Sequence, residues 1–381
     1  MVSPILRMCG VAEDGKCRKS GLELLRIIAV ILIVAHHEVA HSDINVFDQT
    51  FCVKRLFFQL LYLAPGKIGI ALFLLISVWF LADKPATIKG AFRKIWLLWR
   101  ELLFWNLAAL VARLVLDPNG ETSYAMGHAW LDLFFPLTRN EWWYVTSYAI
   151  FLLLLPFVLL NLKKMGKALH GECCLIMLFM WAVLGLVPGA GNDIGLNVVG
   201  FIYIFVLISY YRWYLPRISK RAAWIILAVG MSVIVVANVF LSLIIHDATL
   251  LIEYVSPWEK EWSIPILLIS FGLFELFRSI KWQSRVVNYL ATSALGIYLF
   301  TEQPFFREQL WTKCVVLSDF YDAKYAIFYA LISIMLICVI AGALDLLRSF
   351  LFRLTLDRHR GAWFNALWNM LLSKFSFLTH F

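Results

Sequence analysis

The chain has 381 residues, of which 62% are hydrophobic and only 15% are charged, and its formal net charge is +9. A water-soluble protein of this length carries fewer apolar and more charged residues. The composition therefore excludes a soluble globular fold and predicts an integral membrane protein.

Long, largely uncharged runs follow one another along the chain, each about 17–25 residues long, which is the length that a helix needs to cross a bilayer. The sequence predicts an all-α, polytopic membrane helix bundle of about ten transmembrane helices. The predicted spans are 22–40, 57–82, 95–116, 142–160, 173–188, 196–212, 223–245, 263–280, 287–303 and 325–347.

Most of the 34 basic residues lie in the loops on one side of these spans, and most acids lie on the other side. Lys and Arg in short loops resist translocation, so this bias predicts that both termini are cytoplasmic. The positive charge then faces the lipid bilayer, and no nucleic-acid partner is expected. The predicted division is a cytoplasmic segment 1–21, a membrane domain 22–350, and a basic, aromatic tail 351–381 that lies on the membrane surface.

The first span, "LLRIIAVILIVAHH", has an arginine near its start and two histidines at its end. Arg26 and His37 are separated by three helical turns plus about 20°, so they share one face about 16 Å apart, whereas His36 points about 80° away from Arg26. Ionisable groups inside a membrane are costly and usually mark a site. The alternative is that Arg26 extends to the headgroups and the histidines lie at the outer interface.

The ninth span ends in "SALGIYLFTEQPFFREQLW", and the predicted topology places Glu302 on the outer side, level with His37. Tyr298 lies four residues earlier and shares its face. A carboxylate beside an imidazole can orient a general base and stabilise the cation that forms. The alternative is a solvated acid that pairs weakly with Arg307.

Four stretches in order resemble the acyltransferase 3 family of membrane acyltransferases. The first helix of the family has an arginine, ten intervening residues and a histidine, and the first span resembles this pattern. "GKIGIALFLLISVWFL" is similar to the second helix of the family, and "NEWWYVTSYAIFLLLLPFVLLNL" is similar to the fourth. "GIYLFTEQP" resembles the late signature of the subgroup that acetylates capsular and exopolysaccharides, although Thr301 stands where that subgroup usually has histidine. The matched positions in the first three stretches are Arg26, His37, Gly69, Ile70, Leu72, Phe73, Ser77, Trp143 and Pro156.

The resemblance implies an O-acyltransferase in a bacterial plasma membrane. It would move an acyl group, most often acetyl, from cytoplasmic acyl-CoA to a hydroxyl of a cell-envelope or extracellular polysaccharide or its lipid-linked precursor. No bound cofactor is implied, because acetyl-CoA is a co-substrate. The resemblance is also compatible with a homo-oligomer. The site residues expected are His37 and Glu302 for catalysis, Arg26, Arg93, Lys94 and Arg100 for acyl-CoA, and His36, Trp143 and Tyr298 for the acceptor.

No metal site is predicted, because the seven cysteines lack CxxC or Cys/His metal spacing. Direct transfer by His37 as a base and transfer through an acyl-histidine both remain open. Two other classes of function are kept. One is a transporter or flippase for a glycan precursor or small solute, and the other is a non-catalytic member of the same fold, which Thr301 would favour.

Overall fold

The computed structural model describes residues 19–116, 129–189, 197–359 and 361–374. The predicted N-terminal segment 1–21 lies almost wholly outside these residues, and so does the end of the predicted tail, 375–381. Every regular element in the described ranges is helical, with no strand among them. The prediction of an all-α fold is confirmed.

The first α-helices in the described residues are α2 (Ser20–Ala40), α3 (Val53–Leu81), α4 (Ile88–Leu116), α5 (Ala129–Phe134), α6 (Trp143–Met177) and α7 (Val198–Tyr214). Those that follow in the described residues are α8 (Lys220–Ile244), α9 (Ala248–Val255), α10 (Ile264–Arg278), α11 (Arg285–Leu290), α12 (Ala294–Glu302), α13 (Pro304–Glu308), α14 (Leu317–Tyr321), α15 (Ala326–Leu354) and α16 (Ala362–Lys374). A 3₁₀ turn, η6 (Ala291–Ser293), joins α11 to α12.

Five of the described helices are long and apolar enough to cross a membrane: α3, α4, α6 with its continuation to Leu186, α8 and α15, while α7 is a shorter apolar helix. Large aliphatic side chains such as Val236 on α8 and Val339 on α15 are exposed on the outside of the bundle. Surfaces of this kind suit contact with lipid. The chain is a multi-pass membrane protein, and the count of ten spans and their orientation remain predictions.

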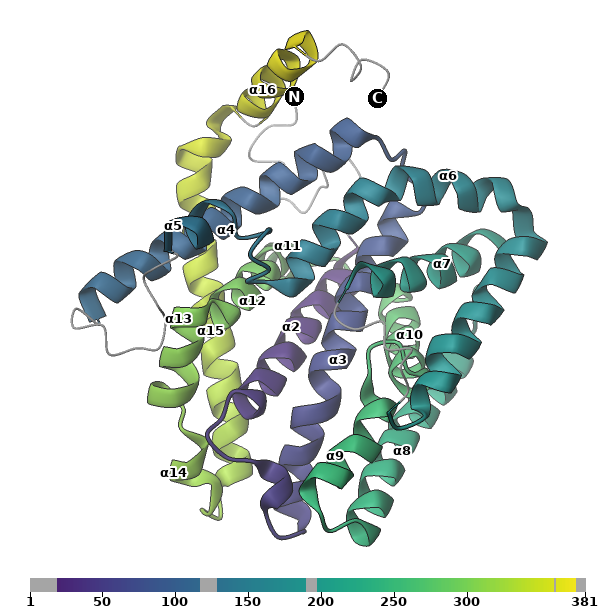
Figure 1. The fold of residues 1–381 in the computed structure, drawn as a ribbon, viewed down its shortest axis with the longest axis vertical. Coiled ribbons are helices and arrows are strands. Elements are labelled where there is room, and N and C mark those ends of the chain that lie inside the picture. The colour runs from purple at the N-terminus through teal and green to yellow at the C-terminus, as the bar shows by residue number, and fades with distance from the viewer. Residues whose placement is uncertain (1–18, 117–128, 190–196, 360, 375–381) are drawn as a thin grey trace.

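Helix α2 lies in the middle of the bundle and packs along α3 on one side and against α12 and α15 on the other (Figure 1). Its close approach to α3 depends on Gly69, because a Cβ at this position would lie 2.5 Å from the carbonyl oxygen of Ala29. Enclosure by other helices explains how α2 can carry Glu23, Arg26 and Glu38 within an apolar bundle.

Three predicted spans have an unexpected form. Spans 142–160 and 173–188 belong to one helical run through α6, which bends at Gly166, where φ is 73° and a side chain would be strained. Span 287–303 is divided into α11, η6 and α12. The hydroxyls of Thr292 and Ser293 donate to the carbonyls of Tyr289 and Leu290, and such bonds compete with regular helical hydrogen bonding.

Candidate active site

Two histidines lie together at the end of α2. His37 is 7% exposed, and His41 follows the last helical residue, with its backbone N–H donating to the carbonyl of His37 at 3.0 Å. Because they are four residues apart on a helix, their side chains project in the same direction, and their ring centroids are 5.3 Å apart. The predicted span ended at residue 40, and His41 was missed for that reason, although its spacing from His37 was a signal.

Glu302, the last residue of α12, reaches both histidines. Its Oε1 lies 3.3 Å from His37 Nδ1 and 2.8 Å from His41 Nε2, while Oε2 lies 3.7 Å from an Arg307 guanidinium nitrogen. The contact with His41 is a hydrogen bond, but the contact with His37 lacks hydrogen-bond geometry, so Nδ1 has no hydrogen-bond partner among the described residues. The structure therefore brings together His37 and Glu302, the two predicted catalytic residues, from segments far apart in the sequence.

The end of α12 is held in place on both sides of Glu302. Trp142, which is buried at the start of α6, donates from Nε1 to the carbonyl of Leu299 at 3.1 Å. Gln303 is buried and caps α13 by accepting hydrogen bonds from the backbone N–H groups of Phe305 and Phe306. These bonds fix the position from which the Glu302 carboxylate projects.

A polar cluster supports Gln303 from α4 and from the turn before α6. Gln303 donates to Asn106 Oδ1 at 3.5 Å, and Asn106 in turn donates to a carboxylate oxygen of Glu141 at 2.6 Å. Burial raises the pKa of Glu141 to about 7, and the hydrogen bond from Asn106 opposes this shift. The cluster lies behind α12 and contacts the residue that follows Glu302.

Tyr298 and His36, two predicted acceptor residues, lie differently. Tyr298 is buried one turn before Glu302, with its ring centroid 6.4 Å from that of His37. His36 instead faces α3, where its Nδ1 donates to the carbonyl of Tyr62. Tyr298 thus belongs to the His37 site, while His36 packs between helices.

Arg26 lies three turns before His37 and bonds within its own helix. Its Nη1 donates to both carboxylate oxygens of Glu23 at 3.0 Å. The guanidinium is also close enough to Tyr144 and Tyr148 on α6 for an electrostatic interaction. Arg26 therefore has a partner within α2 and an electrostatic interaction with α6, and its role in binding the donor remains a prediction.

The basic residues of α4 have other partners. Arg100 pairs with Asp357 at 3.0 Å and lies over the Phe352 ring, both in the segment at the end of α15. Arg93 and Lys94 are exposed on α4. None of the contacts described for these three residues involves Arg26, and their part in binding acyl-CoA remains a prediction.

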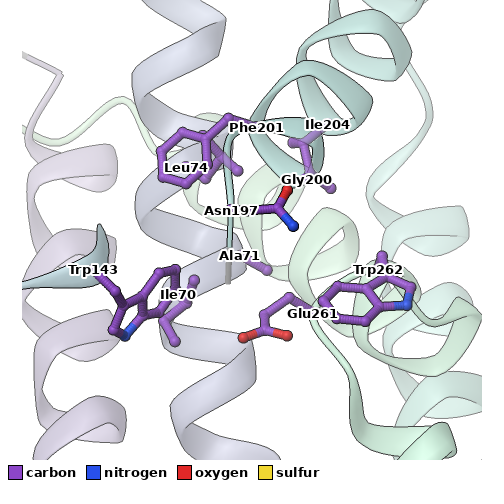
Figure 2. Close-up of a pocket in the computed structure, with 10 residues that line it drawn as sticks. All are labelled: Ile70, Ala71, Leu74, Trp143, Asn197, Gly200, Phe201, Ile204, Glu261 and Trp262. Atoms are coloured by element: carbon purple, nitrogen blue, oxygen red, sulfur yellow. The ribbon is translucent and has the colours of Figure 1, made fainter. Parts of the chain in front are cut away.

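A small pocket opens beside the site, and Trp143 lines it. Figure 2 shows Trp143 and Trp262 on opposite sides, with Asn197 and the Glu261 carboxylate between them. Lys67 on α3 pairs with Glu261 Oε1 at 3.1 Å, and the buried Oε2 has no hydrogen-bond partner among the described residues. The cavity volume is about 30 Å³, which is the room of about two water molecules.

Aromatic contacts connect this pocket to His37. The ring of Trp143 is 5.8 Å from Tyr144, Tyr144 is 6.2 Å from Tyr298, and Tyr298 is 6.4 Å from His37. Trp143 is the pocket residue that was predicted for the acceptor. Lys67 and Glu261 were missed as site residues because only the packing of α3 against the segment before α10 brings them together.

Thr301, which departs from the subgroup pattern, is fully buried and donates from its hydroxyl to the carbonyl of Ile297 in its own helix. The carboxylate that contacts His37 comes from the next residue. The threonine therefore leaves the His37–Glu302 contact in place.

The chain was compared with protein families, curated proteins and solved structures. A family model described as an acyltransferase domain, Acyl_transf_3, matches residues 19–347. This range includes α2, α12 and every residue of the His37 site. No curated protein and no solved structure matches the chain.

Proposed function

Because the chain belongs to the acyltransferase 3 family, we propose that it is a membrane O-acyltransferase that moves an acetyl group from cytoplasmic acetyl-CoA to a hydroxyl. The acceptor in this proposal is a polysaccharide of the cell envelope or its lipid-linked precursor. The observation that carries the proposal is the Glu302 carboxylate, 3.3 Å from Nδ1 of a buried histidine at the end of the central helix.

The chemistry assigned to His37 is general-base catalysis. With its Nδ1 beside the Glu302 carboxylate, the imidazole presents Nε2 as the atom that accepts the proton of the acceptor hydroxyl. The hydroxyl oxygen attacks the thioester carbonyl, a C–O bond forms, and the C–S bond breaks. The coenzyme A thiolate leaves and receives the proton. Glu302 acts as a positioning residue, since its negative charge stabilises the imidazolium while the proton is held.

The proposed donor path uses Arg26. A guanidinium forms paired hydrogen bonds with phosphate oxygens, so Arg26 would exchange Glu23 for a phosphate of the donor. Glu23 and Arg26 form one ion pair at 3.0 Å before the donor arrives. Arg93, Lys94 and Arg100 on α4 are proposed as more distant contributors, which would attract the donor by charge.

The proposed acceptor site is the pocket of Trp143, Trp262 and Glu261. Aromatic faces stack on sugar rings, and a buried carboxylate oxygen without a partner can accept a hydrogen bond from a sugar hydroxyl. The volume of about 30 Å³ admits a hydroxyl group but no whole ring. A sugar would therefore lie across the mouth or move the aromatic walls apart.

The test is an assay of acetyl-CoA turnover by the purified protein in detergent, with and without added polysaccharide. We expect His37→Ala to lower the rate by about 10²–10⁴-fold, which is the usual contribution of a general base. His36→Ala is the matched control, because that ring contacts α3 backbone, and it should retain most activity. Equal rates for wild-type protein and a well-folded His37→Ala variant would exclude the assignment.

A further inference from the structure

The residues at the end of α2 have a spacing that suits a metal as well as a base. His37-Glu38-Val39-Ala40-His41 places two histidines four residues apart with a glutamate after the first. In zinc peptidases the H-E-x-x-H spacing on a helix directs both imidazoles at one ion. The absence of cysteine-containing metal spacings led to the prediction of no metal site, and this motif contains no cysteine.

The third possible ligand comes from α12. One nitrogen each from His37 and His41 and one oxygen from Glu302 all lie within 4.8 Å of one another. A tetrahedral zinc site has metal–ligand bonds of about 2.0–2.2 Å, which separates neighbouring ligand atoms by about 3.4 Å. The observed separations from Glu302 Oε1 are 3.3 Å to His37 and 2.8 Å to His41, so small movements of the side chains would accommodate an ion.

The bonding of the two histidines favours this interpretation. His37 is more than nine-tenths buried, and its Nδ1 lies 3.3 Å from Glu302 Oε1 without forming a hydrogen bond. A buried nitrogen in this state lacks a partner that a cation would provide. Arg307 contacts the other carboxylate oxygen, Oε2, so Oε1 is the oxygen that faces the two imidazoles.

Glu38 distinguishes this site from that of a zinc peptidase. The glutamate of the H-E-x-x-H spacing is the general base in those enzymes, but here Glu38 is fully buried and accepts a hydrogen bond from Ser333 on α15 at 2.9 Å. The chain therefore has the two helical ligands of the motif without its base, which favours metal binding without peptide hydrolysis.

We propose that His37, His41 and Glu302 bind one divalent cation of the zinc class. Two imidazoles and one carboxylate match zinc, whereas calcium and magnesium prefer ligand sets made of oxygen. Three protein ligands leave the fourth tetrahedral position open to water or to another small oxygen ligand.

Metal binding has a consequence that rests on the proposed function. A zinc ion on Nδ1 of His37 leaves the proton of the neutral imidazole on Nε2, so the ring cannot accept a proton there. Bound zinc and the general-base role of His37 exclude each other, and zinc is therefore expected to inhibit acyl transfer reversibly.

The binding test uses full-length protein purified in detergent with an affinity tag that contains no histidine. After treatment with a chelator, Zn²⁺ is titrated by calorimetry, and Co²⁺ by absorption spectroscopy. We expect one equivalent to bind and the cobalt spectrum to be tetrahedral, without the charge-transfer band of a thiolate ligand. His41→Ala and Glu302→Gln should both lose this site, while His246→Ala, which removes an exposed histidine after α8, should bind like the wild type.

Thermal unfolding of each variant checks that it is folded, and added Zn²⁺ should stabilise the wild type but neither site variant. Binding by His41→Ala and Glu302→Gln equal to that of the wild type would overturn the metal site. Loss of binding in both variants, together with acetyl-CoA turnover that Zn²⁺ leaves unchanged, would support the metal site and contradict the assignment of His37 as the base. The two proposals therefore fail separately.

Discussion

Both ends of α2 carry a basic side chain next to a carboxylate, but the two carboxylates come from different parts of the chain. At one end, His37 and His41 meet a carboxylate that comes from α12, 261 residues away from His41 along the chain. At the other end, Arg26 bonds to Glu23, its neighbour by one turn of the same helix. The first arrangement exists only when the bundle is folded, and the second can form in any helix with this sequence.

This difference indicates which part of the proposed reaction is preorganised. The His37 end already has its base, its carboxylate and a buried environment in place, as electrostatic catalysis requires. At the Arg26 end, a donor phosphate has to displace Glu23 before it is bound. We infer that acceptor activation is built into the fold, whereas donor binding involves a local exchange of ion pairs.

The first prediction tests the Arg26 end. Arg26→Ala should weaken acetyl-CoA binding about 10²-fold, because two hydrogen bonds to a charged group are lost at about 1.5–3 kcal/mol each and the cost of leaving Glu23 offsets part of this. Arg26→Lys should restore little, since an ammonium lacks the planar fork.

Calorimetry with acetyl-CoA measures these affinities. Glu23→Gln is the informative counterpart, because it removes the competing charge and should tighten donor binding. Unchanged acetyl-CoA affinity in Arg26→Ala would show that Arg26 pairs with Glu23 but does not bind the donor. The Arg26 end of α2 would then have no part in the proposed reaction.

A second prediction concerns the crossing of α2 and α3, which lies between the two ends. Gly69→Ala would place a Cβ 2.5 Å from the carbonyl oxygen of Ala29, and overpacking of this kind costs about 1–3 kcal/mol of the free energy of unfolding. Thermal unfolding in detergent is the measurement. Gly185→Ala is the control, because a Cβ at this position would lie 3.5 Å from its nearest neighbouring atom. Equal melting temperatures for the two variants would show that α2 and α3 accommodate the added methyl group at Gly69 without loss of stability.

A third prediction tests the His37 end. Glu302→Gln keeps the size of the side chain and removes its charge, so the imidazolium loses its partner and the transfer rate should fall about tenfold. The expected value lies between those of His36→Ala and His37→Ala. Acetyl-CoA turnover at saturating donor measures it, and a rate equal to that of the wild type would leave Glu302 with a structural role alone.

The smallest effect is expected at the pocket. Trp143→Ala should raise the KM for a polysaccharide acceptor about fivefold, since one aromatic stacking contact contributes about 1 kcal/mol, and should leave kcat nearly unchanged. Trp224 on α8, which is 61% exposed and does not line the pocket, provides the control substitution to alanine. A change in kcat without a change in KM would indicate that Trp143 stabilises α6 and does not contact the acceptor.

The sequence predicted the His37 end better than the Arg26 end, and the reason is physical. Helical phase relates Arg26 to His37, and a common depth in the predicted membrane relates His37 to Glu302. The partner of Arg100 is Asp357, 257 residues later in the chain, and no local pattern indicates that pair. Which side chains lie next to α4 depends on long-range packing. Spacing along the sequence therefore could not show whether Arg26, Arg93, Lys94 and Arg100 form one group.

The measurement that tests the central claim most directly is a double-mutant cycle between His37 and Glu302. If Glu302 acts on the reaction only through the imidazole, its effect should disappear when the imidazole is absent. Acetyl transfer is measured for wild-type protein, His37→Ala, Glu302→Gln and the double variant, all checked for folding. The account predicts that the double variant is no slower than His37→Ala alone. A double variant slower than His37→Ala by the full factor that Glu302→Gln causes in the wild type would contradict it.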